Sequence, residues 1–316
     1  MLNNKRFRVS KQVITGFGHN RIGSGQVSGR IYGSIGFNCE YVVVAGGGGG
    51  TDRAGGGGAG GYRSSVVGEL TGGGGAAESL LSLGTGTSYL VSIGAGSTTI
   101  GYPSANGSDS RFASIISKGG AGAGIYGNPN VNTAINFPGG SGSGGEGFGT
   151  SNSGQVRVTN PIQGNNGGIP ATANNAEGDG GGGGAGAQGA NAVWNRGGDG
   201  GNGIASSITG SAVFRAGGGG GGGNNTVDGH GNGGLGSGSR GRNDTGSVPV
   251  GTGAPANSGG GGGGAYWGTG GSGIIILRYP ASRTLVPSAG LTTSTVLQGV
   301  NKVTQITAGA GTVSFT

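Results

Sequence analysis

The sequence predicts a mainly β protein in which a small β-sandwich carries a bundle of polyglycine type II helices, with almost no α-helix. Three observations predict this fold class. Glycine supplies 90 of the 316 residues and is concentrated in runs. Short runs of β-branched and aromatic residues separate the glycine tracts, as strands do. The apolar residues show almost no helical periodicity.

The glycine runs need a structural explanation, because a glycine fixed in one conformation costs about 0.5–1 kcal/mol more than an alanine. A glycine segment can adopt a left-handed threefold extended helix whose backbone N–H and C=O groups point outward. Since no Cβ intervenes, such helices can lie side by side and exchange hydrogen bonds of about 0.5–1.5 kcal/mol each. We expect this lateral bonding in the runs Gly46–Gly50, Gly55–Gly58, Gly72–Gly75, Gly180–Gly184, Gly217–Gly223 and Gly259–Gly264.

The first 38 residues are predicted to form a basic attachment arm. Residues 1–40 contain six basic side chains and one acidic side chain, which gives a net charge of +5 within a chain total of +7. Lys5, Arg6, Arg8 and Lys11 are the candidate attachment residues, and Phe7–Ile14 has a strand-like pattern. Such an arm can dock on an acidic protein surface or stay solvated. Nucleic-acid binding is not supported, because no aromatic residues are interleaved with a dense basic block.

Residues 39–280 are the predicted glycine-rich domain. Glu40–Ala45 and Ile274–Tyr279 are continuous apolar runs, typical of strands buried on both faces. Weaker strands are expected at Ser88–Ile93, Arg111–Ser117 and Ser211–Ala216, and Ala76–Leu83 is the one expected short helix. The residues that interrupt the tracts suit the turns between successive helices; they are Asn165, Asn166, Asp199, Asn202, Asn224 and Asn225.

Residues 281–316 are predicted to be a C-terminal β segment that closes the sandwich or contacts another subunit. Lys302–Thr307 and Gly311–Thr316 have the pattern of a hairpin around the sequence AGAG. The chain has one cysteine, Cys39, so no intrachain disulfide is expected. The apolar runs of about five residues are too short for a membrane span, and no signal region follows the basic N-terminus.

The order of the segments resembles a known family. The segments are EYVVVAGGGGG (Glu40–Gly50), GGGGAGGYRSS (Gly55–Ser65), GTSYLVSIGAG (Gly86–Gly96), GGGGGAGAQG (Gly180–Gly189) and GGGGGGAYWGTGGSGIIILRYP (Gly259–Pro280). They are similar to the glycine-rich domain of bacteriophage tail-fibre and virion structural proteins, especially those of marine and cyanobacterial phages. The pattern is more remotely similar to the glycine-rich domain of some animal receptor kinases, which implies a jelly-roll-like sandwich. The phage resemblance implies host-surface recognition or a structural role on the virion.

No enzyme activity, cofactor or metal is expected. The chain lacks the Gly-Lys-Ser/Thr tripeptide of a phosphate-binding loop. His19 and His230 are far apart in the sequence and are interpreted as structural or surface residues. The charged pairs Asp52/Arg53 and Glu177/Asp179 are interpreted as turn or tract-end groups in preference to an acid/base pair or a cation site.

Aromatic residues at the ends of glycine tracts are the candidate receptor contacts. Trp194 is the first choice, followed by Tyr126, Phe137 and Phe148. Such rings can stack on sugars or anchor a protein contact. The alternative, which we favour slightly, is that they pack over the bundle ends or against another subunit. Tyr266 and Trp267 lie close to the strand at Ile274–Tyr279 and are interpreted as structural.

Together these observations predict a phage virion structural protein, assembled in the host cytoplasm. It would be a tail-fibre or fibre-tip adhesin, or a capsid knob or decoration protein. Its expected partners are other virion proteins through the arm, and a host-surface glycan or outer-membrane protein. We expect a homo-oligomer; a trimer is plausible for a fibre protein, and the sequence does not fix the number of copies. The alternative is a cellular polyglycine protein that binds ice or belongs to an extracellular matrix.

Overall fold

Antiparallel β-sheets dominate the structure, a computed structural model that describes residues 36–51, 55–98, 104–124, 139–147, 156–171, 178–223, 229–241, 253–264 and 268–316. Residues Ser34–Thr316 form one compact unit. The described residues contain no α-helix, so the prediction of a mainly β protein is confirmed. Within these residues, no helix has the length and apolar character needed to cross a membrane. The predicted arm residues Lys5, Arg6, Arg8 and Lys11, and the strand-like Phe7–Ile14, lie outside the described residues.

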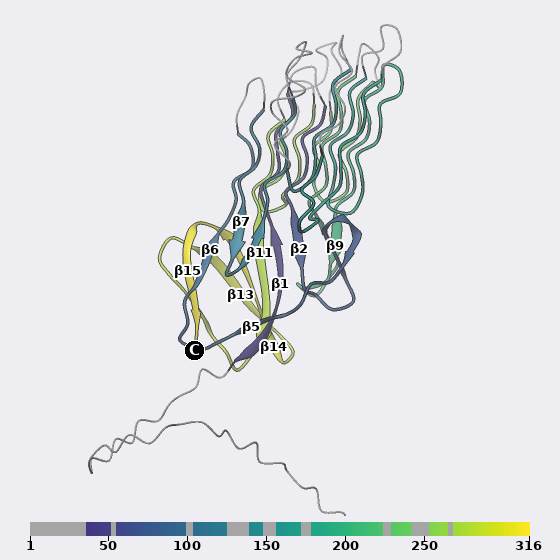
Figure 1. Ribbon diagram of the computed structural model, residues 1–316. Helices are drawn as coiled ribbons and strands as arrows, with labels where there is room; N and C mark the ends of the chain where they lie inside the picture. Colours follow the sequence, from purple (N-terminus) through teal and green to yellow (C-terminus); the bar gives the residue numbers. More distant parts are fainter. Residues whose placement is uncertain are drawn as a thin grey trace, which may run out of the picture. The chain divides into compact units, whose positions relative to one another are not determined.

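The first sheet has the strand order β13-β14-β11-β1-β2 (Figure 1). Its strands are β1 (Phe37–Val44), β2 (Tyr62–Ser64), β11 (Ile274–Pro280), β13 (Thr292–Gln298) and β14 (Asn301–Ala308). The two strands at its centre pair antiparallel, with Val43 opposite Ile275. A short strand, β5 (Leu81–Leu83), pairs with the beginning of β1.

The second sheet has the strand order β12-β15-β6-β7-β8. Its strands are β6 (Tyr89–Ser92), β7 (Ser110–Phe112), β8 (Ile115–Ser117), β12 (Leu285–Pro287) and β15 (Ala310–Phe315). Two small hairpins complete the strands: β9 (Ile204–Ser206) with β10 (Val213–Arg215), and β3 (Leu70–Thr71) with β4 (Gly75–Ala76) around the 3-10 turn η1 (Gly72–Gly74).

The central strands divide their side chains between two buried clusters. Along β1, Tyr41 and Val43 enter a cluster that also contains Phe112 and Phe315 of the second sheet. Val42, between them, enters a second cluster on the opposite face of the first sheet. Strand β11 alternates in the same way, because successive side chains of a strand point to opposite faces. The prediction that Glu40–Ala45 and Ile274–Tyr279 are strands buried on both faces is therefore confirmed.

The expected helix at Ala76–Leu83 is wrong. Ala76 belongs to β4, and Leu81–Leu83 forms β5 instead. The strand forms because pairing with β1 brings Leu83 opposite Phe37, where its side chain is buried in the cluster to which both sheets contribute. A short amphipathic segment follows the tertiary pairing that is open to it, since its own helical preference is weak.

Two strand predictions are also corrected. Arg111–Ser117 was expected to be one strand, but Ala113 has a φ of 52° and the chain reverses there, giving the hairpin of β7 and β8. The predicted hairpin between Lys302–Thr307 and Gly311–Thr316 does not form. Gly309, with a φ of 100°, turns the chain so that β14 joins the first sheet and β15 the second. The expected strands at Ser88–Ile93 and Ser211–Ala216 correspond to β6 and β10.

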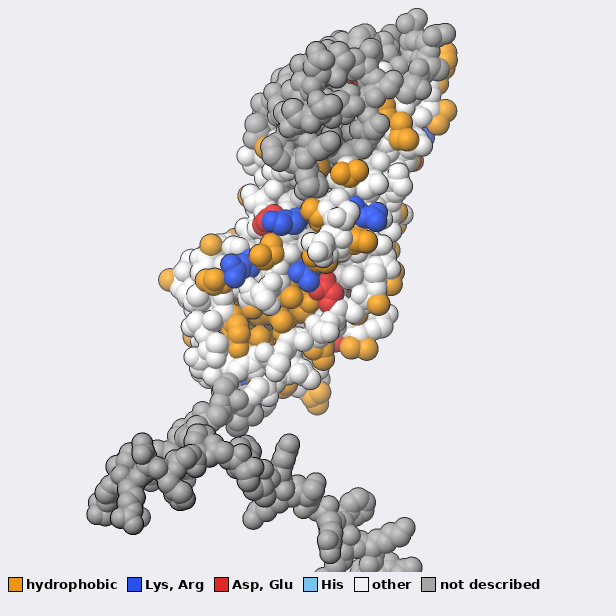
Figure 2. Space-filling view, viewed as in Figure 1, with side chains coloured by type: hydrophobic (Ala, Val, Ile, Leu, Met, Phe, Trp, Pro, Cys, Tyr) orange, Lys and Arg blue, Asp and Glu red, His pale blue; other side chains and the backbone are white. Residues whose placement is uncertain are grey.

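The glycine tracts leave one end of the sheets and run side by side as extended chain (Figure 1). We call them the glycine bundle. Its described residues are 45–51, 55–61, 94–98, 104–109, 118–124, 139–147, 163–171, 178–192, 196–203, 216–223, 229–241, 258–264 and 268–273. On the face shown in Figure 2, the bundle exposes mainly backbone and uncharged polar groups, and charged side chains gather near its junction with the sheets.

Hydrogen bonds in the bundle follow a three-residue period, as the tract 178–185 shows. Its N–H groups donate in rotation to three neighbouring tracts, so that every third residue bonds to the same neighbour. The bonds are 2.7–3.0 Å long. The first neighbour accepts at the carbonyls of Gly222, Gly219 and Ala216, from the N–H groups of Asp179, Gly182 and Ala185 respectively. The second accepts at Gly145 and Gly142, from Gly180 and Gly183, and the third at Ala190 and Ala187, from Gly181 and Gly184.

The C=O groups of the same tract accept bonds from three further tracts. The donors are Gly56 and Ala59, Asn165 and Gly168, and Gly198 and Gly201. The tract 178–185 therefore has six hydrogen-bonded neighbours. This arrangement leaves no room for a side chain at the glycines of the tract: a Cβ added to Gly182 would lie 2.0 Å from the Gly57 carbonyl oxygen.

Four of the polar residues that interrupt the tracts do not make the predicted turns. Asn165, Asn166, Asp199 and Asn202 lie in extended segments, and Asn224 and Asn225 lie outside the described residues. The side-chain amide of Asn165 instead donates to the carbonyls of Gly184 and Ala185 on a neighbouring tract, at 3.0 and 3.1 Å. Asx side chains favour turns because they bond nearby backbone groups, and here that backbone belongs to another tract.

Candidate functional site

Trp194 lies on a tight turn between two tracts of the glycine bundle. Val193 and Arg196 exchange backbone hydrogen bonds of 3.1 and 2.9 Å, which leaves Trp194 and Asn195 as the two turn residues. The tract that follows ends at Gly203, directly before β9. The turn therefore lies at the end of the bundle that is distant from the sheets.

The turn presents an apolar surface to solvent. Trp194 is 59% exposed and Val193 is 70% exposed. Ile169, 48% exposed, belongs to the neighbouring tract and accepts the N–H of Ala192 at 2.9 Å. These three side chains form the Trp194 surface, which combines a flat aromatic ring with two aliphatic groups at a bundle end.

The backbone at Trp194 is held in an unusual conformation. Its φ of 53° lies in the left-handed region, which bulky residues rarely adopt. The Trp194 carbonyl accepts the N–H of Gly178 at 3.0 Å, and this bond fixes the turn to the bundle. A tryptophan here costs of order 1–3 kcal/mol that glycine would avoid, and such strain is found most often at functional sites. The ring is thus exposed on a rigid support at some cost in stability.

Polar groups flank the Trp194 surface on one side. Arg196 and Asp199 form an exposed ion pair of 3.0 Å, and the same Asp199 oxygen accepts the N–H of Asn232 at 2.8 Å. Exposed pairs of this kind contribute little stability, about 0–1 kcal/mol. Their chemistry suits contact with a polar ligand that lies against the ring, because charged donors and acceptors stay available at the rim.

The other sequence-predicted candidates either lie outside the described residues or are buried. Tyr126, Phe137, Phe148, Tyr266 and Trp267 lie outside the described residues, as do His19, Asp52, Arg53 and Glu177. His230 is buried. Asp179 is also buried and accepts the N–H of Gly147 at 2.9 Å, as expected of a tract-end group. The described residues hold no cluster of three or more His, Cys, Asp or Glu that could bind a metal.

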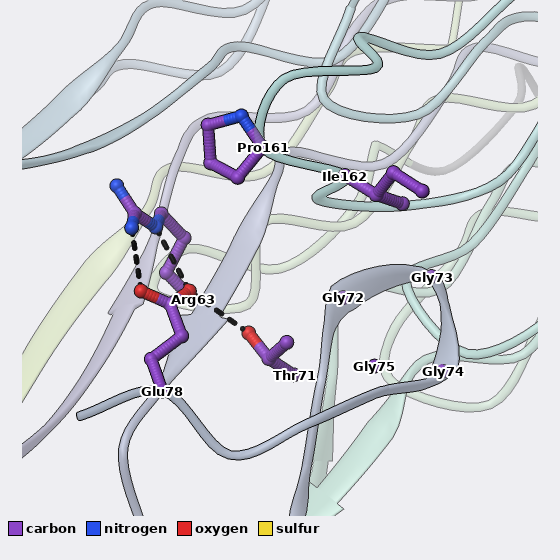
Figure 3. Close-up of a pocket in the computed structure, with 9 residues that line it drawn as sticks. All are labelled: Arg63, Thr71, Gly72, Gly73, Gly74, Gly75, Glu78, Pro161 and Ile162. Carbon is purple, nitrogen blue, oxygen red and sulfur yellow. Dashed lines mark hydrogen bonds and ion pairs between the residues drawn. The ribbon is translucent and has the colours of Figure 1, made fainter.

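A cleft of about 490 Å³ lies beside the first sheet and was not anticipated from the sequence (Figure 3). It is lined by Arg63, Thr71, the glycine turn Gly72–Gly75, Glu78, Pro161 and Ile162. Figure 3 shows the Arg63 guanidinium facing the Glu78 carboxylate through two parallel bonds. The two side chains are 16% and 19% exposed. No sequence signal marks this pair, because the residues come from a strand and from irregular chain 15 positions apart.

The Glu78 carboxylate is fully occupied. Its Oε1 accepts Arg63 Nε at 2.9 Å and the Thr71 hydroxyl at 3.2 Å, while Oε2 accepts Arg63 Nη2 and the Tyr41 hydroxyl at 2.9 Å. Burial raises the pKa of the Tyr41 hydroxyl, and the neighbouring Glu78 raises it further, so Tyr41 stays a donor. With both oxygens bonded twice, the carboxylate holds three strands together.

Comparison of the chain with models of protein families, with curated proteins and with solved structures gave no match.

Proposed function

We propose that the glycine tracts are polyglycine type II helices and that the two sheets form a jelly-roll-like β-sandwich. The support for the helices is the rotation of hydrogen bonds through three neighbours, which a helix with three residues per turn produces. The support for the sandwich is the buried cluster shared by both sheets, to which β14 and β15 of the C-terminal segment contribute Ile306 and Phe315.

We further propose that the chain is a phage virion structural protein, a tail-fibre or fibre-tip adhesin or a capsid knob. The observation that carries the adhesin proposal is the Trp194 surface, because a strained, exposed tryptophan stands at the bundle end farthest from the sheets. The interior tract 178–185, bonded to six neighbouring tracts, supports the proposal that the bundle is a stiff support for this surface. The segment order that resembles phage fibre proteins supports the same proposal.

In this proposal, the basic arm with Lys5, Arg6, Arg8 and Lys11 attaches the chain to the particle. The chain acts as a homo-oligomer, and the exposed apolar side chains Val296, Leu297 and Val300 of the β13–β14 hairpin supply a contact surface at the sheet end. The Trp194 surface then stays free for a host-surface glycan or outer-membrane protein. Aromatic rings dominate the binding energy of such contacts.

The test is host adsorption by particles that carry Trp194→Ala. We expect adsorption to fall by at least tenfold, since loss of a central aromatic contact costs about 2 kcal/mol or more. The matched control is Phe214→Ala, which truncates another exposed aromatic side chain, on β10 and outside both proposed contact surfaces. Particles with the control change should adsorb normally. Normal adsorption by the Trp194→Ala particles, with the protein incorporated at wild-type level, would remove the adhesin role.

A further inference from the structure

Several Asx side chains at the surface of the glycine bundle bond to the backbone of a neighbouring tract, and three of them share one arrangement. Asp199 Oδ1 accepts the N–H of Asn232 at 2.8 Å, and Asn202 Oδ1 accepts the N–H of Leu235 at 3.0 Å. Asn191 Oδ1 accepts the N–H of Ile169 at 2.8 Å. In all three cases a side chain takes the place that a backbone carbonyl of a further tract takes inside the bundle.

The residue after each Asx completes the same contact. The N–H groups of Gly200, Gly203 and Ala192 donate to the carbonyls of Asn232, Leu235 and Ile169, at 2.8, 2.7 and 2.9 Å. The Asx side chain thus accepts the N–H of one residue on the adjacent tract, and the N–H of the residue after the Asx donates to the C=O of that same residue. We call this arrangement the Asx clamp. Among the described residues it occurs three times, twice on the same pair of tracts with a spacing of three residues.

The clamped positions differ from the bundle interior. In the interior tract 178–185, the N–H of Gly182 donates to the Gly219 carbonyl, and an added Cβ would meet the Gly57 carbonyl at 2.0 Å. No side chain fits at such a glycine, whereas the side chains of the clamps lie where a neighbouring tract is missing. Asn191, Asn202, Asn232, Leu235 and Ile169 are all exposed, so the clamps mark the outer boundary of the bundle.

We propose that the Asx clamps close the glycine bundle against lateral growth. The N–H groups of Asn232 and Leu235 would otherwise face outward at the bundle surface, as unpaired groups do at the edge of a β-sheet. Such groups are a template for another extended chain, including a tract of a second copy. The clamps satisfy these N–H groups, and the Asx side chains occupy the space in which the next tract would lie. Lateral association of bundles is thereby blocked, and contacts are directed to the bundle end and the sheets.

The first test is amide hydrogen exchange, measured by NMR, in the double variant Asp199→Gly/Asn202→Gly. We expect exchange at Asn232 and Leu235 to accelerate roughly two- to tenfold, the factor that corresponds to one net hydrogen bond each. The variant Asp199→Asn/Asn202→Asp keeps the accepting oxygens and should retain wild-type exchange. Gln188→Gly is the control for added backbone freedom, because Gln188 is exposed and makes no side-chain hydrogen bond to the described residues. Unchanged exchange in the double glycine variant would overturn the clamp.

The second test is sedimentation velocity over a range of protein concentrations. The double glycine variant should show a larger concentration-dependent mass than the wild-type protein, because the N–H groups of Asn232 and Leu235 lose their side-chain acceptors and can pair with another chain. The oxygen-retaining variant should sediment as the wild type does. Faster exchange without any gain in mass would overturn the closing role, since the face would then be open and still not associate.

Discussion

At the scale of single residues, a glycine of the bundle is fixed by the carbonyl groups that lie against its Cα. A Cβ added to Gly181 would lie 2.1 Å from the backbone carbonyl oxygen of Asp199. A Cβ added to Gly183 would lie 2.2 Å from the backbone carbonyl oxygen of Asn165. Ordinary Cβ contacts are longer by more than 1 Å, so the neighbouring tract would have to move. Movement of one tract strains the bonds that it makes to the others. The glycines are therefore required by packing in a close-fitted interior, and flexibility does not explain them.

We expect Gly182→Ala to lower the free energy of unfolding by about 3 kcal/mol or more, as overpacked interiors do when they cannot relax. Urea denaturation followed by circular dichroism measures the change. The control is Gly124→Ala, because a Cβ at Gly124 meets no described atom within 4 Å. That change should leave stability the same or raise it by about 0.4–1 kcal/mol, through the reduced entropy of the unfolded chain. Similar losses for both variants would refute the packing argument.

At the scale of elements, the Arg63–Glu78 pair connects three strands that are separate in the sequence, β1, β2 and β3. Arg63 lies on β2, and Glu78 also accepts hydrogen bonds from Tyr41 on β1 and Thr71 on β3. An amide in place of the carboxylate would direct an NH₂ group at these donors and leave the guanidinium without its counter-charge. Removing one partner of a largely buried pair is costly, because the other charge stays desolvated.

We therefore expect Glu78→Gln to cost about 3 kcal/mol of stability, measured by thermal or urea denaturation. The comparison is Lys118→Gln, which breaks the exposed Lys118–Asp109 pair of 2.7 Å. An exposed pair contributes about 0–1 kcal/mol, so this change should be nearly silent. If the two substitutions had equal effects, Glu78 would not hold the strands together.

The elements also show what the sequence could predict. Strands β1 and β11 were predictable, because a run of consecutive apolar residues must bury both faces of a strand. The partner of β15 was not, since it depends on the direction of the chain after Gly309, and short-range pattern favoured a local hairpin. The roles of Asp199 and Asn202 were missed for the same reason: a single tract does not reveal which tract lies beside it.

At the scale of the whole molecule, the glycine bundle and the sheets share their hydrogen bonds and cores. The tracts continue directly from the strands, as β1 continues into residues 45–51 and residues 268–273 lead into β11. Ala185 and Ala216 of the bundle belong to the buried cluster on the outer face of the first sheet. A tract that donates to three neighbours and accepts from three others cannot separate without breaking bonds to all of them. Bundle and sheets should therefore open together.

This coupling predicts the pattern of amide protection. The amides of Gly180–Gly184 and Gly217–Gly221 should exchange through the same global opening as those of β1 and β11, with equal free energies of opening. The measurement is hydrogen exchange by NMR, with nitrogen-15 in the glycine, valine and isoleucine amides, at several denaturant concentrations. Global opening makes exchange at every protected site depend on denaturant with the slope of complete unfolding. Fast exchange across the described residues of Gly180–Gly264, beside protected β1 and β11 amides, would show that the tracts are separate loops, and the proposed rigid support for Trp194 would fail with them.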